Sequence, residues 1–402
     1  MRIDEIACKN LNYLRRGVAL VFIFSVCQYV YYYQVYFSET GIFTNYLASH
    51  FYQNLKFILP TASILIHLLA LGSGIALFFG QRTAVSALVC LTCHIFFSIR
   101  NPYLLHLGDK YIFYLLIILI FLPWATIKMN KEGSLKGLLI FAIKAQFLII
   151  YGSNLFLKIQ NGWLNDAGLE SALLETELQT DVARFILNHH TLLNSLNIMA
   201  IFAAATVITL SFFPKYFKYF LILHLGYHLS SLAMLKLDWL PIVACLPGLL
   251  FLPQPASVSI RVGRLYNRIY PVFLLVSLIL SCMSIGSKDN RISRWTQSWS
   301  AYSPPSAFGG TFSTFVRQKN LDKMKVYLNA ESIGSSDTFS NLRHYKLFHY
   351  MAKVESEDLR LSYFKFLCSN SEVDMVGLSY LMIETTGKHQ ITNRILGQAK
   401  CE

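Results

Sequence analysis

The sequence predicts an all-α polytopic membrane protein with about nine transmembrane helices and a small C-terminal domain on the outer face of the membrane. Two observations predict this class. The 402 residues are 54% hydrophobic and only 14% charged, and their mean hydropathy is positive, unlike an average soluble domain. Apolar runs recur along the chain, and most are near the ~20 residues that a helix needs to cross hydrocarbon.

The first apolar run, Gly17–Tyr36, follows a short basic segment without a small-residue cleavage pattern, so we expect no removable signal peptide. Eight further runs are expected to be spans, of which the seventh, Trp239–Pro253, is short and contains three prolines. In chain order they are Thr61–Phe79, Thr83–Ile99, Tyr111–Ile127, Lys136–Leu157, Ser195–Phe213, Tyr216–Leu235, Trp239–Pro253 and Ile269–Ile285. The expected division is a bundle over 1–286 and an outer domain over 287–402, in which Tyr345–Phe366 has the pattern of an amphipathic helix.

The net charge of +13 predicts orientation rather than nucleic-acid binding. If the N-terminus is in the cytoplasm, the inner side has thirteen Lys and Arg residues and the outer loops have six. This agrees with the rule that the cytoplasmic loops of membrane proteins carry an excess of Lys and Arg. An odd number of spans then places the C-terminal domain outside the cytoplasmic membrane. Cys368 and Cys401 would lie in that oxidising space and can pair there, although the sequence alone does not show that they do.

The segment Gln146–Trp163, QFLIIYGSNLFLKIQNGW, is an apolar helix end that carries a lysine. At 3.6 residues per turn, Lys158 shares one stripe with Lys144, Tyr151 and Asn154. Such a stripe is expected to face the bundle interior, where ionisable groups are candidates for function. The alternative is that Lys144 and Lys158 extend to opposite membrane interfaces.

Cys90-Leu91-Thr92-Cys93-His94 matches the pattern of c-type haem attachment. Because it lies inside the third expected span, we interpret it as part of a buried helix with a hydrogen-bonded histidine.

Two more clusters are candidates for a site. Arg100-Asn101 and Asp109-Lys110 lie at the outer mouth of the fourth expected span, although they can equally form a solvated turn with an Arg100–Asp109 pair of little energetic value. His224 and His228 lie four residues apart on one helix face, as two metal ligands can. We see no convincing third ligand, so we favour hydrogen-bonding histidines and predict no metal.

The order of these clusters resembles the HTTM family, bacterial transmembrane relatives of vitamin K-dependent gamma-carboxylase that include sporulation-delaying toxin maturation proteins. The resemblance covers roughly residues 10–305 and continues weakly to YFKFLCSN. It is carried by LRRGVALVF, YFSETGIFTNYL, FFGQRT, SIRNPYLLHLGDKYIFYLLIILIFLPWA, QFLIIYGSNLFLKIQNGWLNDAGLESAL, LHLGYHLSSLAM, LLFLP and WSAYSPPS. The resemblance implies a bundle of nine spans with an outer C-terminus.

The resemblance also implies a chemistry. Lys158, five residues before Trp163, matches the lysine that acts as base toward a reduced quinone. An amine must be neutral to accept a proton, and an apolar pocket favours the neutral form. Reaction with O2 then gives a strong base that takes a proton from a glutamate side chain, whose carbanion captures CO2. The implied pocket contains Arg100, Asn101, Asp109, Lys110, Tyr151, Asn154, Trp163, His224 and His228.

Three functions follow as hypotheses. The first is a quinone-linked enzyme that modifies an exported peptide or protein in the manner of a gamma-glutamyl carboxylase. The second is a membrane partner, with a companion maturation protein, that matures or gives immunity to a secreted peptide toxin without carboxylation. Transport ranks last, because the polar residues gather toward the outer face rather than near mid-membrane.

Overall fold

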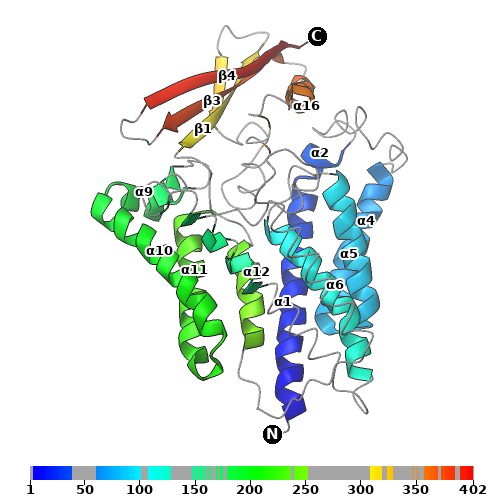
Figure 1. The fold of residues 1–402 in the computed structure, drawn as a ribbon. Coiled ribbons are helices and arrows are strands. Elements are labelled where there is room, and N and C mark those ends of the chain that lie inside the picture. Colours follow the sequence, from blue (N-terminus) through cyan, green and yellow to red (C-terminus); the bar gives the residue numbers. More distant parts are fainter. Residues whose placement is uncertain are drawn as a thin grey trace.

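The computed structural model describes residues 3–38, 60–100, 107–127, 179–236, 240–251, 308–318, 324–328, 357–369, 373–384 and 390–401, together with isolated positions between 147 and 174, and at 347 and 351. A bundle of helices forms most of the molecule, and a small sheet lies at the end of the bundle opposite the N-terminus (Figure 1). The helices are α1 (Ile3–Tyr31), α2 (Tyr33–Tyr36), α4 (Pro60–Phe79), α5 (Thr83–Arg100), α6 (Leu107–Ile127), α9 (Asp181–Leu187), α10 (His190–Ser211), η4 (Pro214–Tyr216), α11 (Phe217–Met234), α12 (Leu240–Cys245), η5 (Leu246–Phe251) and α16 (Glu357–Cys368).

Local sequence signals explain where several helices begin and end. α4 begins at Pro60. Proline suits the first turn of a helix, because the backbone N–H that it lacks would have no partner within the helix at that position. α4 ends before Gly80, which has a φ of 78° in the turn to α5. Thr180 accepts a hydrogen bond from the Ala183 amide at 3.2 Å and so forms the N-cap of α9.

The buried side of the bundle is held by polar as well as apolar contacts. Arg15 of α1 is buried and donates hydrogen bonds to the carbonyls of Leu77 and Phe78, at the C-terminal end of α4. Carbonyls in the last turn of a helix lack the usual donor four residues further on, and the Leu77 carbonyl accepts in addition from the Gly80 amide at 3.1 Å. Arg15 therefore joins α1 to α4 at the end where the N-terminus lies.

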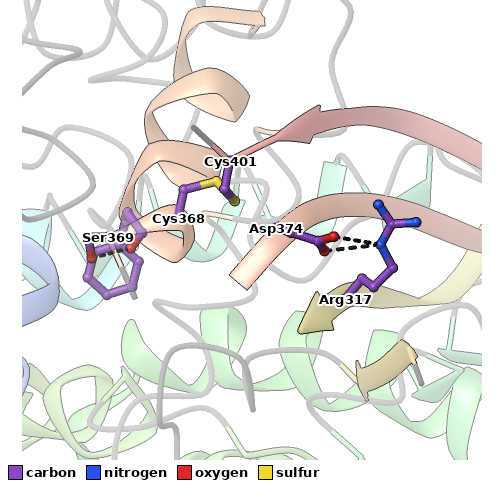
Figure 2. Close-up of a disulfide and its surroundings, with 6 residues drawn as sticks. Arg317, Cys368, Ser369, Asp374 and Cys401 are labelled. Carbon is purple, nitrogen blue, oxygen red and sulfur yellow. Dashed lines mark hydrogen bonds and ion pairs between the residues drawn. A yellow bond between two sulfur atoms is a disulfide. The ribbon is translucent and has the colours of Figure 1, made fainter. Parts of the chain in front are cut away.

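The C-terminal region contains a four-stranded antiparallel sheet of β1 (Phe308–Gln318), β2 (Met324–Leu328), β3 (Val373–Glu384) and β4 (Gln390–Lys400), in the order β2-β1-β3-β4. α16 packs on β3 and β4. Figure 2 shows that the Cys368–Cys401 disulfide joins the end of α16 to the residue after β4, and that Arg317 of β1 pairs with Asp374 of β3 at 3.0 Å. The Ser369 hydroxyl closes the same end of α16 by donating to the Phe366 carbonyl.

The expectation of about nine membrane spans is wrong. Among the described residues, two segments are long and apolar enough to cross a bilayer, Asn12–Tyr31 of α1 and His190–Ser211 of α10. Helices do form at most of the expected places, but the apolar segments of α4, α5 and α6 are shorter and α12 gives way to η5 after six residues. The physical reason is that an apolar run also suits a helix buried in a bundle. The run Ile269–Ile285 and most of Lys136–Leu157 lie outside the described residues.

The all-α expectation is wrong as well, because β1 to β4 form a sheet in the segment expected to be a small helical domain. The expected amphipathic helix over Tyr345–Phe366 appears in part as α16, which begins at Glu357. Strands such as β3, VDMVGLSYLMIE, are apolar on consecutive positions. Their pattern therefore lacks the strict alternation that marks a strand in a sequence.

Candidate functional site

Lys158 is the centre of the candidate site. The described residues between Phe147 and Ile159 are helical, and the Lys158 side chain is only 2% exposed. Its Nζ donates a hydrogen bond to the Tyr227 hydroxyl of α11 at 2.6 Å. This excludes the alternative in which Lys158 extends to a membrane interface.

Two aromatic rings surround the same nitrogen. Lys158 Nζ lies 4.1 Å from the centre of the Trp163 ring and 5.2 Å from that of Tyr227. Both distances are within the range of cation–π attraction, which is strongest with Trp and increases when water is excluded. The rings and the phenol oxygen therefore supply the contacts that suit a cationic side chain.

A second set of groups lies on the same face of α11. The Tyr151 hydroxyl is 2.9 Å from Nδ1 of His224 and is also hydrogen-bonded to Nε2 of His228. All three side chains are buried. The hydrogen-bonding interpretation of the histidines is therefore confirmed, and the described residues contain no group of three His, Cys, Asp or Glu side chains placed to hold a metal.

This hydrogen-bonded set contacts the apolar interior of the bundle on one side. Phe147, Phe217 and Phe220 form a buried cluster with Tyr151, and the Phe220 ring is stacked on His224 at 5.5 Å. On the other side lies the backbone of η5, where a Cβ on Gly248 would come within 2.8 Å of His224 Nε2. A glycine is thus needed at this position for η5 to approach the histidine.

Asn197 of α10, which is not among the residues predicted from the sequence, holds the segment that carries Trp163. Its side-chain amide is fully buried, donates to the Trp163 carbonyl and accepts from the Leu169 amide at 3.1 Å. An asparagine within an apolar helix, in HTLLNSLNIMAIF, was the available signal, because buried polar side chains need partners. Tyr227 was also missed, although it lies between the two candidate histidines in sequence.

Asp109 belongs to a different cluster, formed where α1, α5 and α6 meet. Its side chain is completely buried and accepts a hydrogen bond from Ser25 at 3.4 Å. Its backbone carbonyl accepts from His94 Nε2 at 2.8 Å. The alternative of a solvated turn therefore does not hold for Asp109.

The remaining predicted site residues are placed as follows. Arg100 is the last residue of α5 and is partly buried, and Lys110 lies in the first turn of α6. Asn154 is half-buried in the helical segment that carries Lys158. Asn101 and Lys144 lie outside the described residues.

The haem-like pattern lies inside a buried helix, as expected. Cys90 and Cys93 are buried in α5, where the Cys90 thiol donates to the Ser73 hydroxyl at 3.2 Å. His94 is held by the Asp109 carbonyl. These side chains stabilise the contacts between α4, α5 and α6.

Comparisons with family models, with curated proteins and with solved structures found no match to this chain.

Proposed function

We propose that this protein is a membrane-embedded, quinone-linked enzyme that modifies an exported peptide or protein, with glutamate carboxylation as the reaction. The observation that carries the proposal is the buried Lys158 amine, held against Trp163 and hydrogen-bonded to Tyr227. The residue order that resembles the HTTM family supports the same chemistry.

Exposed apolar side chains support a membrane location. Leu65 of α4, Phe202 of α10 and Ile222 of α11 are each 66% exposed, and similar residues surround them on those helices. A soluble monomer rarely exposes such continuous apolar surface. The Cys368–Cys401 disulfide supports an outer location for the sheet, because disulfides persist in oxidising compartments. The sheet lies at the opposite end of the bundle from the N-terminus (Figure 1), which fits a cytoplasmic N-terminus.

The polar atoms at the site fit an oxygen-bearing ring. Nε1 of Trp163, Nε2 of His224 and Nδ1 of His228 are buried and have no hydrogen-bond partner among the described residues. Buried polar atoms left open are costly unless a ligand or water pairs them. A quinol offers oxygens that can accept from the Trp163 N–H and hydroxyls that can pair with an imidazole nitrogen.

Lys158 acts in this scheme as the base. When bound, the reduced quinone supplies an acidic phenolic hydroxyl and the electrons for reaction with O2, and CO2 is the carbon source. Neutral Lys158 takes the hydroxyl proton on Nζ, and Tyr227 and Trp163 stabilise the ammonium that forms. Groups that already lie where a charge develops during the reaction lower the activation barrier, because they need not reorganise to stabilise that charge.

The test is carboxylation by the purified full chain. The protein in lipid nanodiscs is incubated with reduced menaquinone, O2, bicarbonate and glutamate-containing peptides of proteins exported by the source cells. Mass spectrometry should detect one added CO2 per modified glutamate in the wild type and none in Lys158→Met. Unmodified peptides from a folded, quinol-binding sample would contradict the proposal.

A non-carboxylating role in toxin maturation or immunity is the second candidate. The observation that favours it is β4, which among the described strands pairs only with β3, and an open strand edge can bind an extended peptide. In that case Lys158→Met would preserve toxin maturation or immunity in cells. Loss of both with Lys158→Met would favour the enzyme.

A further inference from the structure

The turn between α10 and α11 carries a short repeat. Lys215-Tyr216-Phe217 is followed directly by Lys218-Tyr219-Phe220. A spacing of three residues places two side chains close together on a helix, so like residues of the two triplets lie near one another. The two phenylalanines are buried, whereas the two lysines and the two tyrosines are exposed. The repeat therefore has an apolar buried side and an exposed side of basic and aromatic groups.

More aromatic side chains extend the exposed side of the repeat. The ring centres of Phe213 and Tyr216 lie 6.4 Å apart, and those of Tyr216 and Tyr219 lie 6.5 Å apart. Phe212 is 63% exposed and Tyr219 is 64% exposed. We call this surface the hairpin patch, and its members are Phe212, Phe213, Lys215, Tyr216, Lys218 and Tyr219. Tyrosines with an apolar ring and a polar tip are enriched where a bilayer meets water.

The charge of the hairpin patch is of one sign. The sequence contains no Asp or Glu from 182 to 237, so the two helices that form the turn supply no carboxylate to Lys215 or Lys218. The ion pairs found among the described residues do not include either lysine. Lys215 Nζ lies 4.8 Å from the centre of the Tyr216 ring, which holds this charge beside a phenol. The patch is therefore complementary to an anion that also has an apolar part.

The position of the hairpin patch indicates which anion this is. The chain passes from α10 to α11 at the end of the bundle where the N-terminus lies, away from the sheet (Figure 1). The segment His190–Ser211 is long and apolar enough to cross a bilayer, and the patch begins at the next residue, Phe212. In a membrane-embedded protein, the patch therefore lies where the hydrocarbon ends and the lipid headgroups begin.

We infer that the hairpin patch binds the headgroups of anionic phospholipids. Lys215 and Lys218 contact the lipid phosphate, and Tyr216 and Tyr219 lie at the boundary between headgroups and acyl chains. Basic residues next to a membrane-crossing helix are attracted to a leaflet that contains anionic lipids. A second copy of this chain does not fit the patch equally well, because two such patches would bring like charges together. The lipid site is separate from the chemistry at Lys158.

The experiment is native mass spectrometry of the full chain in neutral detergent micelles. The probes are dioleoyl-phosphatidylglycerol, which is anionic, and dioleoyl-phosphatidylcholine, which has no net charge, at equal concentrations. The wild type should retain the anionic lipid preferentially, and the preference should decrease at high salt. Lys215→Gln and Lys218→Gln should each lower the preference about fivefold, the usual effect of one basic residue at an anionic membrane surface.

Two controls separate a charge effect at this turn from a general one. Lys365→Gln removes an exposed lysine of α16 and should leave the lipid preference unchanged. Arginine at both 215 and 218 keeps the charge and should keep the preference. The thermal unfolding temperature checks that each variant is folded.

Equal retention of the two lipids by the wild type would overturn the inference, as would a preference that survives in the double variant with Gln at 215 and 218. Glycerol 3-phosphate at millimolar concentration should not displace the anionic lipid. If it does, the two lysines bind a soluble phosphate compound and the assignment to a lipid surface is wrong.

Discussion

Lys158 and Trp163 contact each other through the face of the indole, with Nζ 4.1 Å from the ring centre. They lie five positions apart in the chain, and the contact places a cation-binding surface directly beside the buried amine.

Lys158→Met should abolish carboxylation, with a loss of about 10²- to 10⁴-fold or more, the usual contribution of a positioned base. Lys158→Arg should be equally inactive, because a guanidinium does not lose its proton in proteins. Activity is measured by mass gain of the peptide, and folding by the thermal unfolding temperature. Lys365→Met on the exposed side of α16 is the control and should retain activity.

Asn197→Leu should disturb the position of Trp163 and lower the stability of the protein. The substitution leaves the Trp163 carbonyl and the Leu169 amide without the bonds that Asn197 makes, at a cost of about 1–3 kcal/mol in the free energy of unfolding. Denaturant unfolding and kcat report the two effects separately. The control is Asn194→Leu, on the same helix but only half-buried, which should have a much smaller effect. Equal losses of stability and of kcat in the two variants would contradict the role of Asn197 in positioning Trp163.

Gly248→Ala should displace His224. The new Cβ would lie 2.7 Å from Cδ2 and 2.8 Å from Nε2 of the ring, closer than such atoms approach, so the Tyr151–His224 bond must lengthen or η5 must move. The ¹⁵N NMR signals of His224 and the affinity of the protein for reduced menaquinone should both change. Gly226→Ala on α11 meets no atom within 4 Å and should leave both unchanged while stabilising the helix by about 0.5–1 kcal/mol.

Arg15→Met should loosen the contact between α1 and α4. The carbonyls of Leu77 and Phe78 lose their buried donor, and we expect a cost of about 1–3 kcal/mol in the free energy of unfolding. Hydrogen exchange at the end of α4 should increase. The neighbouring Arg16 is exposed and its guanidinium lies 5.9 Å from the Phe78 ring, so Arg16→Met should cost clearly less.

Reduction of the Cys368–Cys401 disulfide should destabilise the sheet and α16 without altering the Lys158 site. The bond closes a segment of 33 residues, for which the loss of chain entropy in the unfolded state predicts about 3–4 kcal/mol. Cys401→Ser should lower the unfolding temperature of the sheet. Cys27→Ser, at an exposed free thiol, serves as the control, and an unchanged sheet in Cys401→Ser would contradict the prediction.

Helix positions were largely predictable from the sequence, because periodicity and end signals are local. The expected run Thr83–Ile99 corresponds to α5, Thr83–Arg100, and Thr61–Phe79 to α4, Pro60–Phe79. The number of membrane spans was not predictable, because the hydropathy of a run does not distinguish lipid from the interior of a bundle. The sheet was missed because its strands join residues as distant as Thr314 and Leu378.

The sequence by itself determined that Tyr151 and Lys158 share a helix face and that His224 and His228 share another, since the turn of a helix fixes both. Only the tertiary structure decided that these two faces meet. Lys158 reaches Tyr227 across 69 residues, and Tyr151 reaches His228 across 77. Contacts at that separation depend on how helices pack, which no local pattern of residues contains. The physical reason is that a buried amine and a buried phenol are stable only when the fold brings a partner to each.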